Sequence, residues 1–185
     1  MPIEIQTNQL PGPDRPEPTI DDVQRQVLQF VREEAGFAQV FTINKDGFPV
    51  GRTMVAAVED DWSATFVQRR VHKRLGQLLR NPKLEIMWIA DPAPENRIER
   101  PHVYDTGLNA PRAVFLRGIA EPLDPAETIR RFRRRTEYYT ARGNTRVAEY
   151  TDEQITEDLV GFHIRPIQVR AEGFGSGAQS YTWTV

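Results

Sequence analysis

The sequence contains no cysteine. This absence excludes disulfide bonds, thiolate catalysis and zinc sites with cysteine ligands. Only three serines are present, and none lies in the tight strand-to-helix turn that exposes a serine nucleophile. We therefore expect no covalent catalysis through either residue type, and the lack of cysteine fits a reducing cytoplasm.

The sequence also lacks the signals of membrane, secreted, nucleic-acid-binding, metal-binding and nucleotide-binding proteins. No apolar run approaches the length of a membrane span, and the first 14 residues are polar and proline-rich, unlike a secretory signal. The net charge of −2 argues against a general nucleic-acid-binding protein. His102 and His163 have no metal-ligand spacing, and no P-loop or dinucleotide fingerprint is present. We expect a cytoplasmic protein with a small-molecule substrate and no metal, membrane or nucleic-acid partner.

The length of 185 residues suits one well-buried domain. Residues 1–18 include five prolines, which predicts an extended arm without a core of its own. Residues 19–185 are expected to form a single domain. A long segment, 91–111, shows no periodicity, and we expect it to border the substrate face of a binding site.

The order of apolar segments and turns predicts a mainly β fold with flanking helices. Strands are expected at 37–43, 48–58, 62–68, 83–90, 112–122 and 162–170, the last with a bulge or an edge at Pro166. Helices should follow Thr19, Asp124 and Thr151, each of which resembles an N-cap. Because tight turns join successive strands, we predict an antiparallel barrel rather than a doubly wound parallel sheet.

A basic cluster at 69–74 leads into a short predicted helix that ends at Asn81-Pro82. The spacing of Val71, Leu75, Leu78 and Leu79 predicts one apolar stripe. The cluster therefore lies at the positive end of the helix dipole, where unpaired backbone N–H groups add further donors. A bound anion such as phosphate would relieve this arrangement, whereas the alternative is a solvated basic turn.

A second cation falls in an unexpected place in the strand at 48–58. Alternation puts Arg52 on the same face as Val50 and Met54, where a guanidinium is costly unless it is paired. The partner is either a carboxylate on a neighbouring strand or the anion that Lys73 and Arg74 also face.

The order of these motifs resembles the pyridoxamine 5′-phosphate oxidase-like family, whose fold is the FMN-binding split barrel. The segment 37–43 is followed by a hairpin that reads Asp46-Gly47-Phe48-Pro49, and Arg52 stands two residues before Met54. A basic pair then precedes Asn81-Pro82 by seven or eight residues, as in that family. The resemblance covers residues 37–89 well and 112–170 more loosely.

The resemblance implies a cofactor site. Arg52, Lys73 and Arg74 would hold the flavin phosphate, with Arg74 in the place of the family's lysine. His72 stands where the family often has a serine. The backbone of Thr53, Met54 and Val55 would line the ribityl chain and ring, and the isoalloxazine edge would be flanked by Phe66, Val67 and Gln68.

The resemblance also implies an FMN-dependent oxidoreductase that works as a homodimer, with no catalytic residue identified because the flavin itself carries the hydride or electrons. Two alternatives remain open: a reductase that uses a deazaflavin coenzyme, and a protein that binds flavin or haem without turnover. The family's oxidases place a glutamine early in the fifth strand, whereas residues 113–118 contain none. Their substrate-phosphate residues also lack a counterpart in the tail, so we do not expect the vitamin B6 reaction.

The last two features of the sequence have open interpretations. The aromatic tail with Tyr181 and Trp183 either reaches across a dimer or packs on its own barrel. The arginine-rich stretch at 130–135 is expected to be a solvated helix face paired with acids. Alternatively, it borders the site and attracts an anionic substrate or a polyanionic cofactor tail.

Overall fold

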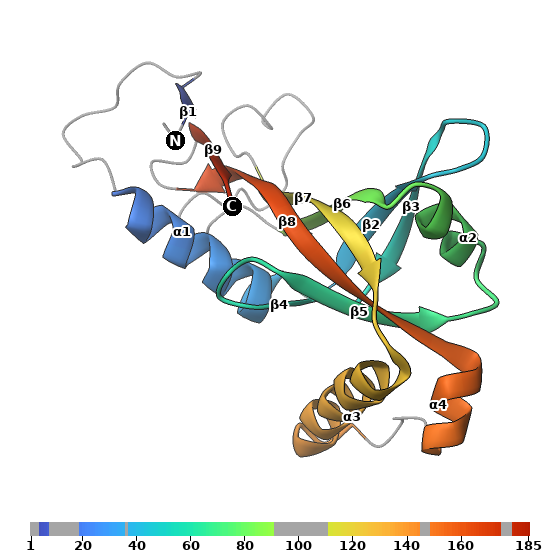
Figure 1. The fold of residues 1–185 in the computed structure, drawn as a ribbon. Coiled ribbons are helices and arrows are strands. Elements are labelled where there is room, and N and C mark those ends of the chain that lie inside the picture. Colours follow the sequence, from blue (N-terminus) through green and yellow to red (C-terminus); the bar gives the residue numbers. More distant parts are fainter. Residues whose placement is uncertain (1–3, 8–18, 36, 91–110, 145–148, 175–178) are drawn as a thin grey trace, which may run out of the picture.

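A computed structural model describes residues 4–7, 19–35, 37–90, 111–144, 149–174 and 179–185. Nine antiparallel strands in these residues form one curled sheet, an open half-barrel with helices at its ends (Figure 1). The strands are β1 (Glu4–Thr7), β2 (Ala38–Ile43), β3 (Pro49–Met54), β4 (Ala57–Val58), β5 (Ala64–Arg69), β6 (Lys83–Ala90), β7 (Arg112–Pro122), β8 (Leu159–Phe174) and β9 (Gln179–Thr184). The helices are α1 (Ile20–Gln29) with its wider π-helical end η1 (Phe30–Glu34), α2 (Lys73–Arg80), α3 (Pro125–Ala141) and α4 (Asp152–Asp158). The predicted split barrel is confirmed.

The long strand β8 is the centre of the sheet. Its first half pairs with β5 on one side, its second half pairs with β9, and β7 runs beside it along most of its length. The sheet continues from β7 through β6 and β2 to β3. The register between β7 and β8 shifts at Gly118, opposite Pro166, as expected for a residue without an N–H. A Cβ at Gly118 would lie 2.7 Å from the Arg165 carbonyl oxygen, so the strands approach closely here.

The predicted strand at 48–58 is wrong in one respect, because it is two strands. β3 pairs with β2, whereas β4 pairs with β5, so the chain changes partner at Val55 and Ala56. Along its described residues β3 pairs only with β2, which makes it an edge strand. This edge position decides how Arg52 is exposed, as described below.

The main core lies between the curled sheet and α1. Thr19 caps α1 by accepting a hydrogen bond from the Asp22 N–H, and Val23, Val27 and Phe30 are fully buried. β9 also belongs to this core, since Tyr181 and Trp183 are buried and the Trp183 ring packs edge-on against Trp62 at 5.4 Å. The aromatic tail therefore packs on its own barrel.

A smaller core fixes α3 beneath the sheet. Asp124 caps α3 and Pro125 begins it, as the sequence predicts, and Phe132 packs with Ile155 of α4 and Leu159 of β8. Figure 1 shows α3 and α4 together below the first half of β8, away from α1. This packing makes α3 one wall of a hollow whose other wall is the sheet.

Two sequence predictions fall mainly outside these residues. The segment predicted to border the site, 91–111, is described only at Pro111, and the arm at 1–18 only at β1, which pairs with β9. Among the described helices, none combines the length and the hydropathy that a membrane crossing requires.

Candidate functional site

The site is built around the start of α2, which is basic as predicted. His72 has extended backbone and precedes the first helical residue, but its side chain makes no capping hydrogen bond. The first turn contains no acidic residue. The N–H groups and the positive end of the helix dipole therefore meet cations, an arrangement that favours a bound anion.

The predicted apolar stripe of α2 is wrong at two of its four positions. Leu78 is buried, but Val71 and Leu79 are exposed. Arg74, one helical turn before Leu78, takes the inward position instead and is only 7% exposed. The helix thus carries a guanidinium into the interior at the point where the sequence suggests an aliphatic contact.

Arg74 is held there by residues of β5. Its Nε donates a hydrogen bond to Oε1 of Gln68 at 2.5 Å, and its guanidinium lies 5.9 Å from the centroid of the Phe66 ring. Its Nη1 is buried and has no hydrogen-bond partner among the described residues. Burial, followed by the nearby charge of Arg52, lowers the pKa of Arg74 to about 10. The group remains a cation at neutral pH, and no carboxylate of the described residues forms an ion pair with it.

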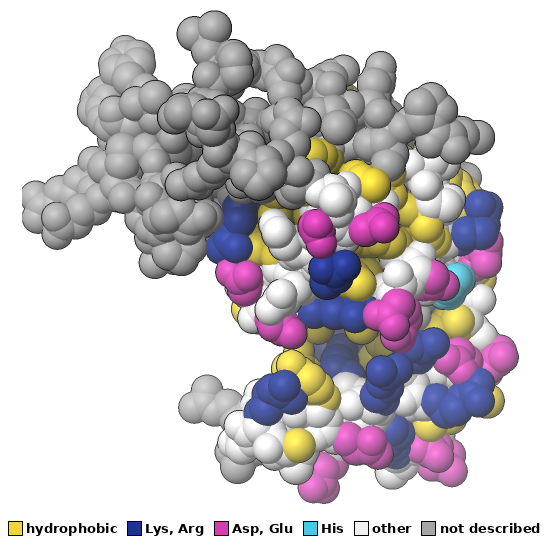
Figure 2. Space-filling view, turned by 90° about the vertical axis from the view of Figure 1, so that its left-hand side faces the viewer, with side chains coloured by type: hydrophobic (Ala, Val, Ile, Leu, Met, Phe, Trp, Pro, Cys, Tyr) yellow, Lys and Arg dark blue, Asp and Glu magenta, His cyan; other side chains and the backbone are white. Residues whose placement is uncertain are grey.

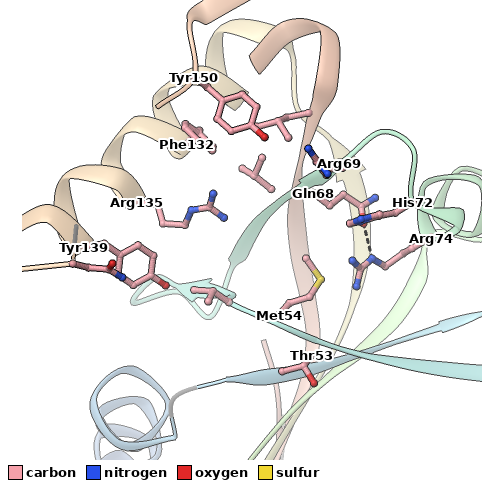
Figure 3. A pocket seen from close by; sticks show the side chains of 14 residues that line it. Thr53, Met54, Gln68, Arg69, His72, Arg74, Phe132, Arg135, Tyr139 and Tyr150 are labelled. Carbon is pink, nitrogen blue, oxygen red and sulfur yellow. Dashed lines mark hydrogen bonds between the residues drawn. The ribbon is translucent and has the colours of Figure 1, made fainter. Parts of the chain in front are cut away.

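Gln68 has an unpartnered donor of its own. Its side chain is buried, its Oε1 is occupied by Arg74, and its Nε2 makes no hydrogen bond to a described group. Figure 3 shows the two side chains joined at the edge of the hollow. Buried donors without partners are rare in native folds, and a bound ligand, ion or ordered water would supply the missing acceptor.

Two adjoining hollows meet at Arg74. The first, with a cavity volume of about 500 Å³, lies between β3, β5 and α3, and the second, of about 990 Å³, lies between β3 and α2. Thr53, His72 and Arg74 line both. Figure 2 shows a hollowed face with Lys and Arg side chains on its floor.

Nine of the ten residues that sequence reasoning assigned to the cofactor site line this double hollow. The first contains Thr53, Met54, Val55, Val67, Gln68, His72 and Arg74; the second contains Arg52, Thr53, His72, Lys73 and Arg74. Phe66 is the exception, because it is 2% exposed and packs in the core against Phe162 and the Arg74 guanidinium. It supports the site from beneath.

Arg52 faces the second hollow, but not for the predicted reason. It is exposed because β3 is an edge strand, so its guanidinium is not buried in an apolar row. The desolvated cation is Arg74, and the charge of Arg52 contributes to its lowered pKa. Both cations still face the same space.

Sequence reasoning did not assign the far wall of the first hollow to the cofactor site, although bordering the site was one of its two interpretations of the stretch at 130–135. This wall is formed by α3 and the segments that follow, through Phe132, Arg135, Tyr139, Asn144 and Tyr150. Figure 3 shows Arg135 on the wall opposite Arg74. The positions 132, 135 and 139 share one helical face, so the spacing i, i+3, i+7 could have identified them.

Arg135 differs from the other arginines of α3. Arg130, Arg131, Arg133 and Arg134 each pair with a carboxylate, as the expectation of a solvated basic face requires. Arg135 makes no ion pair with a described carboxylate; its guanidinium lies 5.0 Å from the Phe132 ring centroid, and burial lowers its pKa. Arg135 is thus a half-buried cation that lines the hollow together with the buried Arg74.

Solved structures share this fold at low sequence identity. A haem storage protein from Vibrio cholerae, HutZ, matches with a TM-score of 0.59 and 15% identity over 83% of this chain and 97% of that chain. A Clostridium acetobutylicum protein related to general stress protein 26 of B. subtilis, of the pyridoxinephosphate oxidase family, matches with a TM-score of 0.57. The two chains are 13% identical over 88% of this chain and 96% of that chain. A haem-binding protein from Mycobacterium smegmatis matches with a TM-score of 0.56 and 15% identity, over 87% of this chain and 57% of that chain.

Comparison at the level of sequence is more specific. No curated protein matches this chain. The family model of pyridoxamine 5′-phosphate oxidase, however, matches residues 23–172, which include every strand from β2 to β7, most of β8, and all the residues that line the double hollow. The chain therefore belongs to the pyridoxamine 5′-phosphate oxidase family.

Proposed function

We propose that the protein is an FMN-dependent oxidoreductase whose cofactor phosphate binds between Arg74, Lys73 and Arg52. The observation that carries this proposal is Arg74, a buried guanidinium that, among the described residues, has no partner for its Nη1 and no carboxylate in an ion pair. A phosphate supplies the missing charge and accepts charge-assisted hydrogen bonds, which arginine forms in a rigid fork.

The residues present fit such a group. Two donors have no described hydrogen-bond partner, Arg74 Nη1 and Gln68 Nε2; Arg74 lines both hollows and Gln68 lines the first, next to the basic start of α2. Met54, Val55 and Val67 give the first hollow an apolar lining suited to a flat ring. The phosphate would therefore occupy the cationic second hollow and the ring the first.

The division of labour follows from this lining. Bound flavin accepts or donates a hydride or electrons, so the protein has to bind and orient the flavin and the substrate and to exclude water. Arg74 and Lys73 anchor the cofactor, while the apolar walls keep the ring dry. We further propose that Arg135, on the opposite wall, binds an anionic group of the substrate, since it faces the hollow without a described carboxylate partner.

The experiment is to purify the protein, record its visible absorbance, and titrate the cofactor-free form with FMN and riboflavin. FMN gives two visible bands, and we expect it to bind at least tenfold more tightly than riboflavin. Reduction of the bound flavin by NADH or NADPH without oxygen would support an oxidoreductase. A haem spectrum, or bound flavin that no donor reduces, would instead support a binding protein.

A deazaflavin coenzyme is the second candidate, favoured by the charge of the second hollow. Lys45 and Arg80 add to Arg52, Lys73 and Arg74, whereas Asp46 is the one acid in the lining. This exceeds the two negative charges of a monophosphate, so a longer anionic tail would be stabilised there. A single visible band in the purified protein, and tighter binding of the deazaflavin than of FMN, would favour this candidate.

A further inference from the structure

Gln68 and Arg74 form a pair of unusual composition. Gln68 is near the end of β5 and Arg74 is in the first turn of α2, and both are more than nine-tenths buried. Phe66, two residues before Gln68 on the same strand face, lies under the guanidinium that the amide holds at its Nε edge. β5 therefore supplies two contacts to one cation: the Phe66 ring below the guanidinium and the Gln68 amide oxygen at its Nε.

The acceptor in this pair is neutral. Two other partly buried arginines outside the hollows bind carboxylates: Arg112 pairs with Glu34, and Arg131 pairs with Glu59 and Glu127. An amide oxygen can fix the plane of the guanidinium as a carboxylate does, because the guanidinium is a rigid fork and one bond at Nε sets its orientation. Unlike a carboxylate, it leaves the positive charge uncompensated.

Among the described residues, the amide makes no second hydrogen bond that would give it a purely structural role. Its Nε2 has no hydrogen-bond partner among the described residues, so Arg74 is the described group that Gln68 holds. Burying an amide with half of its capacity unused costs stability. That cost is explained if the amide serves the guanidinium and the ligand rather than the fold.

We propose that Gln68 is a positioning residue, which orients the Arg74 guanidinium toward a bound phosphate while leaving its charge available to that phosphate. The inference rests on the phosphate site proposed above. It assigns to Gln68 a role through Arg74, in addition to any contact with the ring.

Two substitutions separate orientation from charge. Gln68→Glu keeps the shape of the side chain and the acceptor at Arg74 Nε, but it neutralises the cation. Gln68→Met keeps the approximate size and the charge of Arg74, but it removes the acceptor. Gln168→Glu is the matched control, because Gln168 Oε1 accepts a hydrogen bond from Arg117 at 3.3 Å on the exposed surface, outside both hollows.

Three quantities are measured for each protein: the affinities for FMN and riboflavin, the stabilisation by inorganic phosphate, and the thermal midpoint without ligand. The ratio of FMN to riboflavin affinity isolates the phosphate, because ring contacts cancel. We expect Gln68→Glu to lower this ratio at least tenfold, to abolish stabilisation by phosphate, and to raise the ligand-free midpoint by about 2–4 °C as the buried cation gains a partner. Gln68→Met should lower the ratio at least threefold without raising the midpoint, and Gln168→Glu should leave the ratio unchanged.

The inference is overturned if Gln68→Glu leaves the ratio unchanged, or weakens FMN and riboflavin equally, as a merely structural residue would. A Gln68→Glu protein that fails to fold also overturns it, because the introduced carboxylate should pair with Arg74. The proposed function fails separately, when phosphate stabilises the wild-type protein but FMN does not bind. Absence of both FMN and phosphate binding in the wild type overturns both.

Discussion

Arg131 of α3 donates a hydrogen bond of 2.8 Å from Nη1 to Oε1 of Glu59. Glu59 lies 72 residues earlier, in the turn before β5. The same guanidinium binds Glu127 through its Nε at 2.7 Å. This bridge ties the outer side of α3 to the sheet, while Phe132 and Arg135 face inward. The position of the far wall of the hollow thus depends on a polar contact as well as on the small core.

Glu59→Gln should loosen α3 without unfolding the barrel. Both partners are about one-third exposed, so the unfolding free energy should fall by only about 0.5–1 kcal/mol. The amides of α3 should exchange hydrogen faster, whereas those of β7 and β8 should not. Glu121→Gln, which removes an exposed ion pair with Arg165, is the control; equal exchange in both variants would contradict a role for Glu59 in holding α3.

The same bridge should make stability depend on pH in the acid range. A hydrogen bond from Arg131, followed by the charges of Arg130 and Arg131, holds the pKa of Glu127 below its ordinary value of 4.5. The stabilising contribution is therefore complete above that value and is lost as the pH falls through the lower pKa of the folded state. Glu127→Gln should destabilise the protein at pH 7, and its difference from wild type should shrink below about pH 4 as the wild-type carboxyl is protonated.

Urea unfolding at pH 7 and at pH 3.5 measures this difference. Glu137→Gln is the control on the same helix, because Glu137 is exposed and forms no ion pair with a described residue. A destabilisation by Glu127→Gln that stays constant between the two pH values would contradict the assignment.

The two cations of the phosphate site should differ in their effects. Arg74→Ala should weaken FMN by at least about tenfold, equivalent to 1.4 kcal/mol, because a desolvated charge interacts strongly with a phosphate. Arg52→Ala should also weaken FMN binding, but by less, since Arg52 is exposed. Riboflavin should bind all three proteins with nearly equal affinity.

Stability of the ligand-free protein gives the second measurement. Removing Arg74 relieves a buried cation that pairs with no carboxylate in the part of the chain that the structure describes, so thermal unfolding should begin no earlier than in wild type. Unchanged FMN affinity in both variants would place the phosphate elsewhere.

Local signals in the sequence were sufficient for much of the fold and for one side of the site. The β2–β3 hairpin, the caps at Asp124 and Thr151 and the basic start of α2 depend on neighbouring residues, and all are present. The exposure of Arg52 could not be predicted, because alternation gives a face but not whether another strand covers it. Arg135 could not be separated from the neighbouring arginines for a related reason: its burial depends on how α3 packs against β5 and β8.

The inward turn of Arg74 illustrates the limit of periodicity. Val71 and Leu79 fit an apolar stripe by spacing, yet the sheet meets α2 on the face that carries Arg74 and Leu78. A pattern of hydrophobic residues therefore predicted the helix correctly but not its rotation.

The protein is expected to be a homodimer. Phe48 and Phe37, at the two ends of the β2–β3 hairpin, are 67% and 66% exposed, and Leu79 of α2 is 64% exposed. Exposed aromatic and aliphatic side chains next to an edge strand favour association. Light scattering of the cofactor-loaded protein should give twice the mass of one chain; the mass of one chain at micromolar concentration would contradict this.

Arg135→Met should impair binding on the substrate side and leave the cofactor in place. The guanidinium faces the first hollow from the wall opposite Arg74, so it is expected to bind an anionic group and not the cofactor phosphate. In the FMN-loaded protein, pyridoxine 5′-phosphate and pyridoxine are matched probes that differ by one phosphate. We expect the substitution to weaken the phosphorylated probe about tenfold or more, to change pyridoxine and FMN less than twofold, and not to lower the thermal midpoint.

Arg134→Met is the control for this substitution, because Arg134 is the preceding residue but is exposed and reaches Glu59 outside the hollow. It should leave both probes unchanged, since it removes the same charge from the same helix without removing a group that lines the hollow. Similar losses in both variants would indicate a long-range effect of net charge, and that effect should disappear at high salt. A loss confined to Arg135→Met that persists in salt requires direct contact, because a half-buried guanidinium is screened much less than an exposed one.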